Sequence, residues 1–454
     1  MGNGLINLLN IISKKNKNVS NKVKAKIITF SFFLLFCNMF LSSLGVYSGS
    51  SSVAAIVGIF ITFVVIWFFA DNHISSGDLI NKPVVILFFF VGIFFLISAV
   101  LHKVAAFILI SFILLFVLPV FYFTVGNDYN NFLYMMSLGA RYSYILMLIV
   151  SVFISPLSNG QYASFLGNPN GLGSFLSVIF VVVLYLYEIN DNKKDRIINM
   201  FLIGSIFALC IFTKSRTTYL SLGFSFFIYV IYMIIDRSYN LRDLIGRVIK
   251  IFVSSFVSLI LMFSLLTYVS NFILSLEENI FGQSFKIVFN PESSYNEITD
   301  LKGQLQGAAE RGKKGIGDSN SFSSGRAEIW RTYLNDLNLT GHNADKLKVP
   351  YQGGYLEANA HNTYLQIAHS GGVVAGISFV VLNIMFAFYL FKVLFRGIRN
   401  RKIDIKYLFV GSMLISCEII MMLSSVYYPY ISAVSVVYYF VIGCFFVKPR
   451  CLDD

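Results

Sequence analysis

Two basic residues at positions 214 and 216 stand out because long apolar runs lie on both sides of them. The segment reads Thr213-Lys214-Ser215-Arg216. A guanidinium group held at the end of a helix can form bidentate hydrogen bonds with phosphate. Basic residues at a membrane surface more often only face lipid headgroups, and the spacing alone leaves both interpretations open. Lys214 and Arg216 are therefore candidate anion ligands.

A third candidate anion ligand is Arg326, at the start of a predicted helix that Ser324 would cap. Apolar residues then recur at helical spacing: Ile329, Trp330, Tyr333, Leu334 and Leu337. We expect this amphipathic helix to lie in the membrane interface, where the free amides of its first turn attract anions. The alternative is an arginine that only solvates the headgroup region.

Histidines follow this helix. His342 comes directly after a glycine, and His361 precedes Asn362 where the next apolar run begins. A neutral imidazole can orient or deprotonate a hydroxyl group near neutral pH. His361 is therefore a candidate base, and His342 and Asn362 are candidate substrate ligands. A lone histidine is more often a hydrogen-bonded polar group, and His369 is predicted to be a packed helix residue.

Three more polar residues are candidate ligands. Asn168 suits the N-cap of a helix that begins at Pro169, which explains most of this motif, but a polar cleft could also use Asn168 or Asn170. Glu418 lies inside an apolar run, where an ionisable residue is costly and often functional. It either lines a substrate cavity or is a protonated, hydrogen-bonded packing residue.

The composition identifies the environment of these residues. Hydrophobic residues make up 56% of the 454 residues and charged residues 13%, and the mean hydropathy is +0.72. A soluble domain carries about 25% charged residues, so we predict an all-α polytopic membrane protein. The net charge of +12 is spread over short segments between apolar runs, which argues against nucleic acid as a partner. The cysteines form no disulfide or zinc pattern: Cys37, Cys210, Cys417, Cys444 and Cys451.

About twelve apolar runs are long enough to span a membrane: 27–44, 51–70, 83–101, 104–125, 132–154, 171–188, 197–213, 217–235, 250–276, 363–391, 407–427 and 430–447. If the basic N-terminus is cytoplasmic, 23 of the 35 Lys and Arg residues fall on the cytoplasmic side, as the positive-inside rule requires, and nine of the other twelve lie in the long polar segment. Both termini are then cytoplasmic. We therefore divide the chain into 1–276 with nine spans, an external loop at 277–362 that contains the amphipathic helix, and 363–454 with three spans.

The order of these motifs resembles that of the O-antigen ligase and polymerase superfamily. The resemblance covers roughly residues 160–430 and rests on Gly-Asn-Pro-Asn-Gly at 167–171, Lys-Ser-Arg-Thr at 214–217, Ser-Gly-Arg-x-x-Ile-Trp at 324–330, Gly-His at 341–342 and His-Asn-x-Tyr-Leu-Gln at 361–366. Two features depart from the family pattern. Gln161 stands near the place where a basic residue is usual, and Gly341-His342-Asn343 replaces the usual Gly-x-Gly.

The resemblance implies a GT-C-like fold and a metal-independent, inverting glycosyltransferase. Its donor would be a glycan on undecaprenyl pyrophosphate, and it would act at the outer face of the bacterial cytoplasmic membrane on an acceptor glycan. The family's two motif arginines correspond to Arg216 and Arg326, and its motif histidine corresponds to His361. We predict no cofactor and no metal, because the turn at 45–50 has no carboxylate and the chain contains no Asp-x-Asp sequence.

Several activities remain open at this level. A composition rich in Asn, Lys, Ile and Phe is typical of an AT-rich bacterial genome and slightly favours a capsule, exopolysaccharide or O-antigen repeat-unit polymerase over a ligase that moves finished glycan to another acceptor. A flippase or transporter for lipid-linked sugar would carry charges through the bundle core, whereas here the unusual polar groups gather at one face. A non-enzymatic assembly factor would tolerate substitution of Arg326 and His361.

Overall fold

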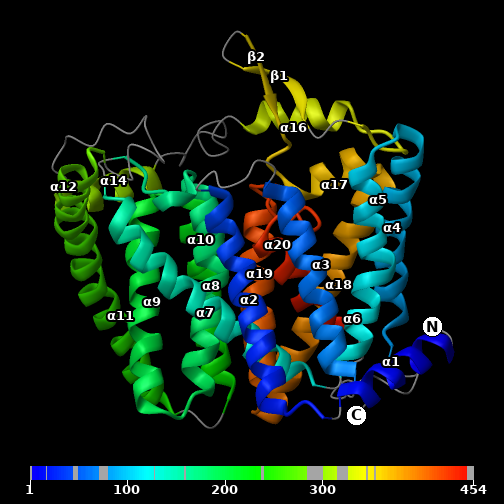
Figure 1. The fold of residues 1–454 in the computed structure, drawn as a ribbon, viewed down its shortest axis with the longest axis horizontal. Helices are drawn as coiled ribbons and strands as arrows, with labels where there is room; N and C mark the ends of the chain where they lie inside the picture. Colours follow the sequence, from blue (N-terminus) through cyan, green and yellow to red (C-terminus); the bar gives the residue numbers. More distant parts are fainter. Residues whose placement is uncertain are drawn as a thin grey trace.

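The computed structural model describes residues 3–16, 18–43, 50–70, 80–126, 128–157, 160–236, 240–283, 300–313, 326–343, 346–351 and 354–446, and the statements below concern these residues. They form a bundle of roughly parallel and antiparallel helices with a small cap at one end (Figure 1). The short helix α1 (Asn3–Asn16) lies at the opposite end from this cap. The prediction of an all-α polytopic membrane protein is confirmed.

Every predicted span contains a helix in the structure, although 407–427 is helical only as far as Met421 and 430–447 only from Ala433. The bundle helices are α2 (Asn21–Ser43), α3 (Ser50–Phe69), α4 (Lys82–His102), α5 (Ala105–Phe112), α6 (Leu118–Val125), α7 (Tyr129–Ile154), α8 (Pro169–Ile189), α9 (Lys193–Thr213), α10 (Arg216–Ile235), α11 (Leu241–Ser264), α12 (Ser270–Phe281), α17 (Thr363–Gly371), α18 (Val373–Asn400), α19 (Ile405–Met421) and α20 (Ala433–Val441). The π turns η3 (Ile113–Val117) and η5 (Leu265–Val269) join α5 to α6 and α11 to α12, and two 3₁₀ turns, η4 (Ser164–Leu166) and η6 (Ile442–Phe445), precede α8 and follow α20.

Eight of these helical stretches are long and apolar enough to cross a membrane, by length and composition, among the residues that the structure describes. The other four predicted spans are α2, α3, α19 and α20 with η6, of which α3 and α20–η6 contain shorter apolar helices. Of the eight, α8 is the most deeply buried. Its apolar side chains contribute to one continuous hydrophobic core with α2, α7, α9, α10 and α19.

Two other predicted runs have clearly different helix boundaries in the structure. The run at 250–276 is part of a longer helical stretch from Leu241 to Phe281, since the more polar residues before the run are helical as well. The run at 363–391 is two helices, since the chain turns at Gly372, which has a φ of +90°. Only glycine adopts such a backbone conformation without steric cost. The short helix α17 is therefore separated from the membrane-length helix α18.

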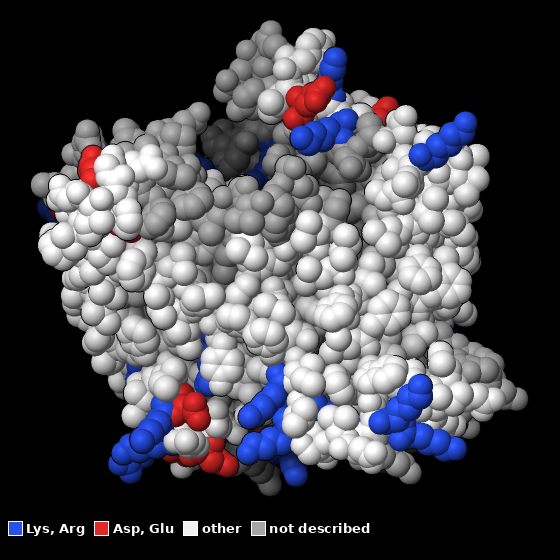
Figure 2. Space-filling model, in the orientation of Figure 1, with Lys and Arg blue, Asp and Glu red and all other residues white. Residues whose placement is uncertain are grey.

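The cap consists of the helix α16 (Arg326–Asn335) and an antiparallel hairpin of β1 (Leu347–Tyr351) and β2 (Gly354–Ala358). The helix α14 (Leu301–Lys313) lies at the same end of the bundle but packs against α9, away from α16 (Figure 1). Strand register pairs Val349 with Leu356. Lys and Arg side chains lie along the end of the bundle away from this cap, with some acidic side chains among them, and a smaller number lie on and beside the cap (Figure 2). This distribution agrees with the charge asymmetry on which the predicted topology rests.

The predicted amphipathic helix is confirmed as α16. The expected contact with lipid is wrong for the two buried residues of its apolar face, which pack against protein instead. Ile329 and Tyr333 pack against Val349, Ala358 and Ala360, so the hairpin covers this face. The Tyr333 hydroxyl also donates a hydrogen bond to the Ala358 carbonyl over 3.0 Å. The predicted cap at Ser324 lies outside the described residues.

Candidate active site

A polar pocket of about 120 Å³ lies where the cap meets the bundle. Its lining includes Asn170, Lys214, Arg216 and Arg326, four of the residues predicted from sequence. The remaining lining residues are Gln161, Ser215, Thr217, Leu220, Arg311 and Leu423. Four cationic side chains therefore converge on one cavity, and the described residues of its lining include no carboxylate.

The tight turn between α9 and α10 supplies two of the cations. Lys214 adopts the left-handed conformation, with a φ of +50°, and its amide donates to the Ile211 carbonyl and so ends α9. The next residue, Ser215, is the N-cap of α10, which starts at Arg216. A turn this short leaves Lys214 and Arg216 at the same end of two antiparallel helices. The basic pair thus faces one cavity because of the local turn geometry.

The polar segment before α8 is held against this turn. The Gln161 side chain donates hydrogen bonds to the carbonyls of Thr213 and Lys214 over 3.3 and 3.2 Å. The Ser215 hydroxyl donates to the Asn170 side-chain oxygen over 3.1 Å. Gln161, noted above as a departure from the family pattern, therefore braces the turn that carries the two cations.

The segment between α12 and α17 supplies the other two cations. Arg326 is the first residue of α16, and Arg311 lies near the end of α14. The Lys214 ammonium group lies against α14, because a Cβ atom built on Gly307 would be 3.0 Å from its Nζ. Elements separated by about a hundred positions in the chain therefore enclose the pocket together.

The cations influence one another. Burial lowers the pKa of the Arg326 guanidinium, and the nearby charge of Arg216 lowers it further. Burial also lowers the pKa of Lys214. Like charges brought together in a partly dehydrated cavity repel, and an anion between them would relieve that repulsion. The electrostatics of this pocket are therefore those of an anion site.

His361 lies next to this group of cations. Burial lowers the pKa of its imidazole, and the positive charge of Arg326 lowers it further. His361 has a φ of +45°, in a region that a non-glycine residue seldom occupies. The conformation is held on both sides: the Asn359 side chain accepts a hydrogen bond from the His361 amide, and the Gln366 side chain accepts one from the Ala360 amide. The imidazole is therefore kept neutral and fixed beside the cationic pocket.

Two of the predicted polar ligands have structural partners instead. The Asn168 side chain caps α8 by accepting hydrogen bonds from the amides of Asn170 and Gly171. Asn362 caps α17 by accepting from the Leu365 amide, and it donates to the Met422 carbonyl over 3.1 Å. Asn362 thereby fixes the position of the turn that carries His361.

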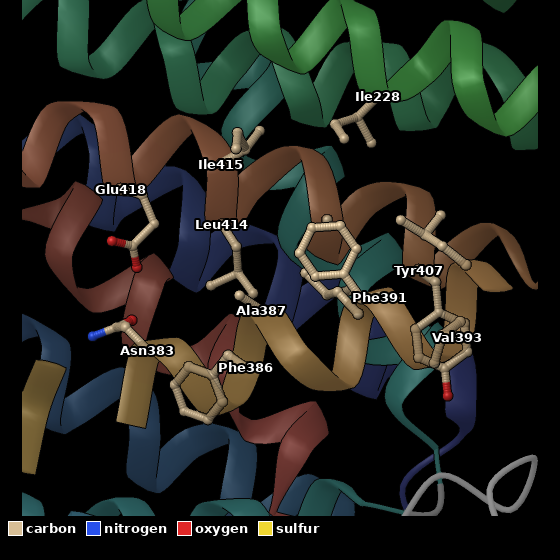
Figure 3. A pocket seen from close by; sticks show the side chains of 13 residues that line it. Ile228, Asn383, Phe386, Ala387, Phe391, Val393, Tyr407, Leu414, Ile415 and Glu418 are labelled. Atoms are coloured by element: carbon tan, nitrogen blue, oxygen red, sulfur yellow. The ribbon is translucent and has the colours of Figure 1, made fainter. Parts of the chain in front are cut away.

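Glu418 belongs to a different cavity. Its carboxylate accepts a short hydrogen bond from the Tyr364 hydroxyl. Glu418 and Asn383 lie at one end of a mostly apolar cavity of about 130 Å³ between α10, α18 and α19 (Figure 3). It does not line the pocket of Arg216 and Arg326.

His342 also lies outside the cationic pocket. Its ring stacks on that of His369 with centroids 4.3 Å apart, and both Nε2 atoms approach the carboxylate of Asp336. His369 is buried in α17, as predicted.

Arg311 is the lining cation that sequence reasoning missed. It lies in α14, inside the segment that was treated only as a long polar loop. A helical signal was present, because Leu301, Leu305 and Ala308 recur at helical spacing before a basic end. The hairpin of β1 and β2 was missed as well.

The comparisons with known proteins agree with the motif order. Residues 198–380 match the family model described as O-Antigen ligase (Wzy_C). No curated protein and no solved structure matches the chain significantly. The matched range contains the α9–α10 turn, α14, α16 and the turn at His361, and therefore all four cations of the pocket. The helical bundle is thus similar to the O-antigen ligase family over residues 198–380, which supports a relation to the O-antigen ligase and polymerase superfamily of membrane enzymes.

Proposed function

We propose that this protein is a glycosyltransferase that uses a glycan carried on undecaprenyl pyrophosphate and acts at the outer face of the bacterial cytoplasmic membrane. The observation that carries the proposal is the convergence of Lys214, Arg216, Arg311 and Arg326 on one pocket next to a neutral imidazole. A diphosphate bears several negative charges in a small volume, so a cavity with several cations suits it better than a neutral ligand.

The arginines would stabilise the leaving group. When the bond between the anomeric carbon and the diphosphate oxygen breaks, negative charge develops on the diphosphate. Arg216 and Arg326 present planar guanidinium groups, which can hold phosphate oxygens by paired hydrogen bonds. Fixed donors of this kind stabilise the transition state more than the substrate, because the charge is largest there. The chemistry then needs no metal ion at the diphosphate.

His361 would accept the proton of the attacking hydroxyl group. As the acceptor oxygen forms its bond to the anomeric carbon, its proton moves to the imidazole and the bonding pair of the old glycosidic bond leaves with the diphosphate. Attack from the face opposite the leaving group inverts the anomeric centre. A base must be deprotonated before the reaction, and both burial and Arg326 favour the neutral form of His361.

We favour a repeat-unit polymerase, in which the acceptor is the sugar end of a second lipid-linked glycan. The alternative is a ligase that transfers finished glycan to a different acceptor. The two are distinguished by giving the purified protein only the lipid-linked repeat unit. A polymerase then forms longer glycan and releases undecaprenyl pyrophosphate, whereas a ligase forms product only when its own acceptor is added.

The central experiment measures glycan transfer by the full-length protein in detergent or nanodiscs. We expect Arg216→Ala and Arg326→Ala to reduce kcat by about 10²–10³, the usual cost of removing one donor to a developing charge. Arg331→Ala is the matched control, because Arg331 is an exposed residue of α16 outside the pocket. Equal activity of Arg326→Ala and Arg331→Ala would contradict the proposed role of the pocket.

The same assay tests the transporter alternative. A flippase moves the lipid-linked glycan between leaflets without changing it, so in detergent it would yield no new glycosidic bond and no free undecaprenyl pyrophosphate. Transbilayer movement in vesicles without any chemical product would overturn the proposed enzyme.

A further inference from the structure

A second cluster of polar residues lies between the end of α16 and α17. Asp336 follows α16 directly, His342 lies in the segment after it, and His369 projects from α17. One ligand atom from each residue lies within 4.8 Å of the others. The Asp336 Oδ2 atom is 3.0 Å from His369 Nε2 and 3.6 Å from His342 Nε2. None of the three lines the cationic pocket.

The hydrogen bonds around His342 conflict when the cluster is treated as a simple polar network. Its Nε2 atom is 2.6 Å from the Asp336 carbonyl oxygen and 2.9 Å from the Asn338 Nδ2 atom. The Asn338 orientation is fixed, because its Oδ1 atom accepts from the amides of Thr340 and Gly341 over 2.9 and 2.6 Å.

One ring nitrogen cannot satisfy both of these neighbours. A protonated Nε2 donates to the carbonyl but meets the hydrogens of the Asn338 amide group. An unprotonated Nε2 accepts from Asn338 but presents its lone pair to the carbonyl oxygen. A cation shared by the unprotonated nitrogen and the Asp336 carbonyl oxygen would remove the repulsion between their lone pairs.

We propose that Asp336, His342 and His369 bind a divalent first-row transition metal ion such as Zn²⁺. Bonds of about 2.0–2.1 Å in a tetrahedral site place ligand atoms about 3.3 Å apart. The distances from Asp336 Oδ2 to the two imidazole nitrogens bracket this separation. Two imidazoles and one carboxylate are a donor set for such ions, and the Asp336 carbonyl oxygen is available as a further ligand.

The surroundings allow an ion to enter and keep the ligands oriented. The side chains of Asp336 and His342 are 44% and 25% exposed, whereas that of His369 is fully buried. The ring of Tyr333 packs edge-on against that of His369, with centroids 4.8 Å apart. The site is thus open to solvent on one side and braced by packing on the other, as a metal centre requires.

The ion would connect the two elements that hold the proposed catalytic residues. Arg326 begins α16 and Asp336 follows its end, while His361 precedes α17 and His369 lies within it. The ion is a positioning element in this scheme and touches no reacting atom. Metal binding itself does not depend on the proposed transferase activity, so the two proposals can fail separately.

The experiment uses full-length protein purified without a polyhistidine tag, stripped with a chelator and titrated with Zn²⁺ or Co²⁺ alone. We expect one ion per chain, the visible absorption bands of Co²⁺ in a low-symmetry nitrogen and oxygen site, and a rise in the unfolding temperature on Zn²⁺ addition. His342→Ala and Asp336→Asn should lose all three signals. Both side chains are partly exposed, so these variants are suited to the test even if His369→Ala does not fold.

The matched control is His102→Ala, which removes a histidine from the end of α4 outside the cluster and should bind metal like the unchanged protein. Absence of saturable binding by the folded protein would overturn the proposal. So would equal stoichiometry and absorption for His342→Ala and His102→Ala, because the cluster would then be a hydrogen-bonded contact and nothing more.

Discussion

His361 combines an unusual backbone conformation with an imidazole whose pKa is lowered by burial and by the charge of Arg326. Its φ of +45° costs conformational energy, and the hydrogen bonds of its neighbours maintain that conformation. The strained turn places the ring next to the charge of Arg326. A base positioned in this way needs no carboxylate partner to stay deprotonated.

The pH dependence of the reaction follows from this environment. Burial first, and Arg326 second, lower the pKa of His361 below its ordinary value of 6.5. The neutral form, which the proposed mechanism needs, therefore predominates at neutral pH and is lost as the pH falls through the lowered pKa. We expect the acid limb of the pH profile of kcat/KM to lie below 6.5, and a limb at or above that value would contradict the assignment.

Charge alone should not replace a guanidinium group in the pocket. Arg326→Lys keeps the positive charge but loses the paired hydrogen bonds to phosphate. With about 1.5–3 kcal/mol for a hydrogen bond to a charged group, we expect a decrease of about 10–100-fold in kcat/KM. The assay should place Arg326→Lys between the unchanged protein and Arg326→Ala; an activity equal to that of the unchanged protein would show that only charge matters.

At the residue scale, the sequence identified most of the pocket but not the direction of each side chain. Lys214 and Arg216 were found because basic residues at the predicted outer end of a span run against the general charge bias, and Arg326 because it begins an amphipathic helix. Glu418 was assigned to the same group because sequence gives its depth in the span and not the face that it occupies. Its partner Tyr364 comes from another helix, so only the packing of α17 against α19 could reveal the second cavity.

At the scale of elements, the contact between the segment after α16 and the junction of α17 and α18 depends on two glycines. A Cβ atom on Gly341 would lie 2.2 Å from the Ser370 carbonyl oxygen, and one on Gly372 would lie 2.2 Å from the Leu339 carbonyl oxygen. Between them the Val373 amide donates to the Asn338 carbonyl over 2.9 Å. The cap is joined to the bundle by backbone contact that any larger residue would open.

A pair of glycine variants tests this joint. Gly341 has a φ of +78° and Gly282 one of +72°, so alanine costs about 1–2 kcal/mol of backbone strain at either position. Only Gly341→Ala also collides with the bundle, since nothing lies within 4 Å of a Cβ on Gly282. A shift of about 1 Å at a catalytic group can cost about 10²-fold in rate. We expect that loss for Gly341→Ala and near-normal transfer for Gly282→Ala.

Equal activity of the two glycine variants would show that the joint does not position the pocket. The measurement should include protein levels in the membrane, because both variants carry the same backbone strain and should accumulate alike.

The elements differed in how well sequence could predict them. Apolar runs of span length identified all of the bundle helices, because the membrane leaves few other backbone structures. The hairpin of β1 and β2 and the helix α14 were missed, since they are short and polar and pack against elements distant in the sequence, the hairpin against α16 and α14 against α9. The apolar face of α16 was predicted correctly from its spacing. The hairpin that covers this face was not predicted, because it lies 12 or more residues further along the chain.

At the scale of the whole molecule, the charge distribution predicts which end faces the cytoplasm. The basic end around α1 would be cytoplasmic and the cap external (Figures 1 and 2). Leu339 in the cap is 68% exposed, and Asp191 between α8 and α9 is exposed at the opposite end. We expect a membrane-impermeant thiol reagent to label Leu339→Cys, but not Asp191→Cys, in intact cells.

Disruption of the cells should expose both sites, and the parent protein without an added cysteine is the control. Labelling of Asp191→Cys alone in intact cells would reverse the topology and remove the pocket from the outer face.

The positive charges of the pocket come from separate elements, with Lys214 and Arg216 at the α9–α10 turn, Arg311 on α14 and Arg326 on α16. Without an anion these charges repel one another, and a bound diphosphate would turn the repulsion into attraction. Substrate binding would then also hold the three elements together, and departure of the spent lipid carrier would remove that attraction.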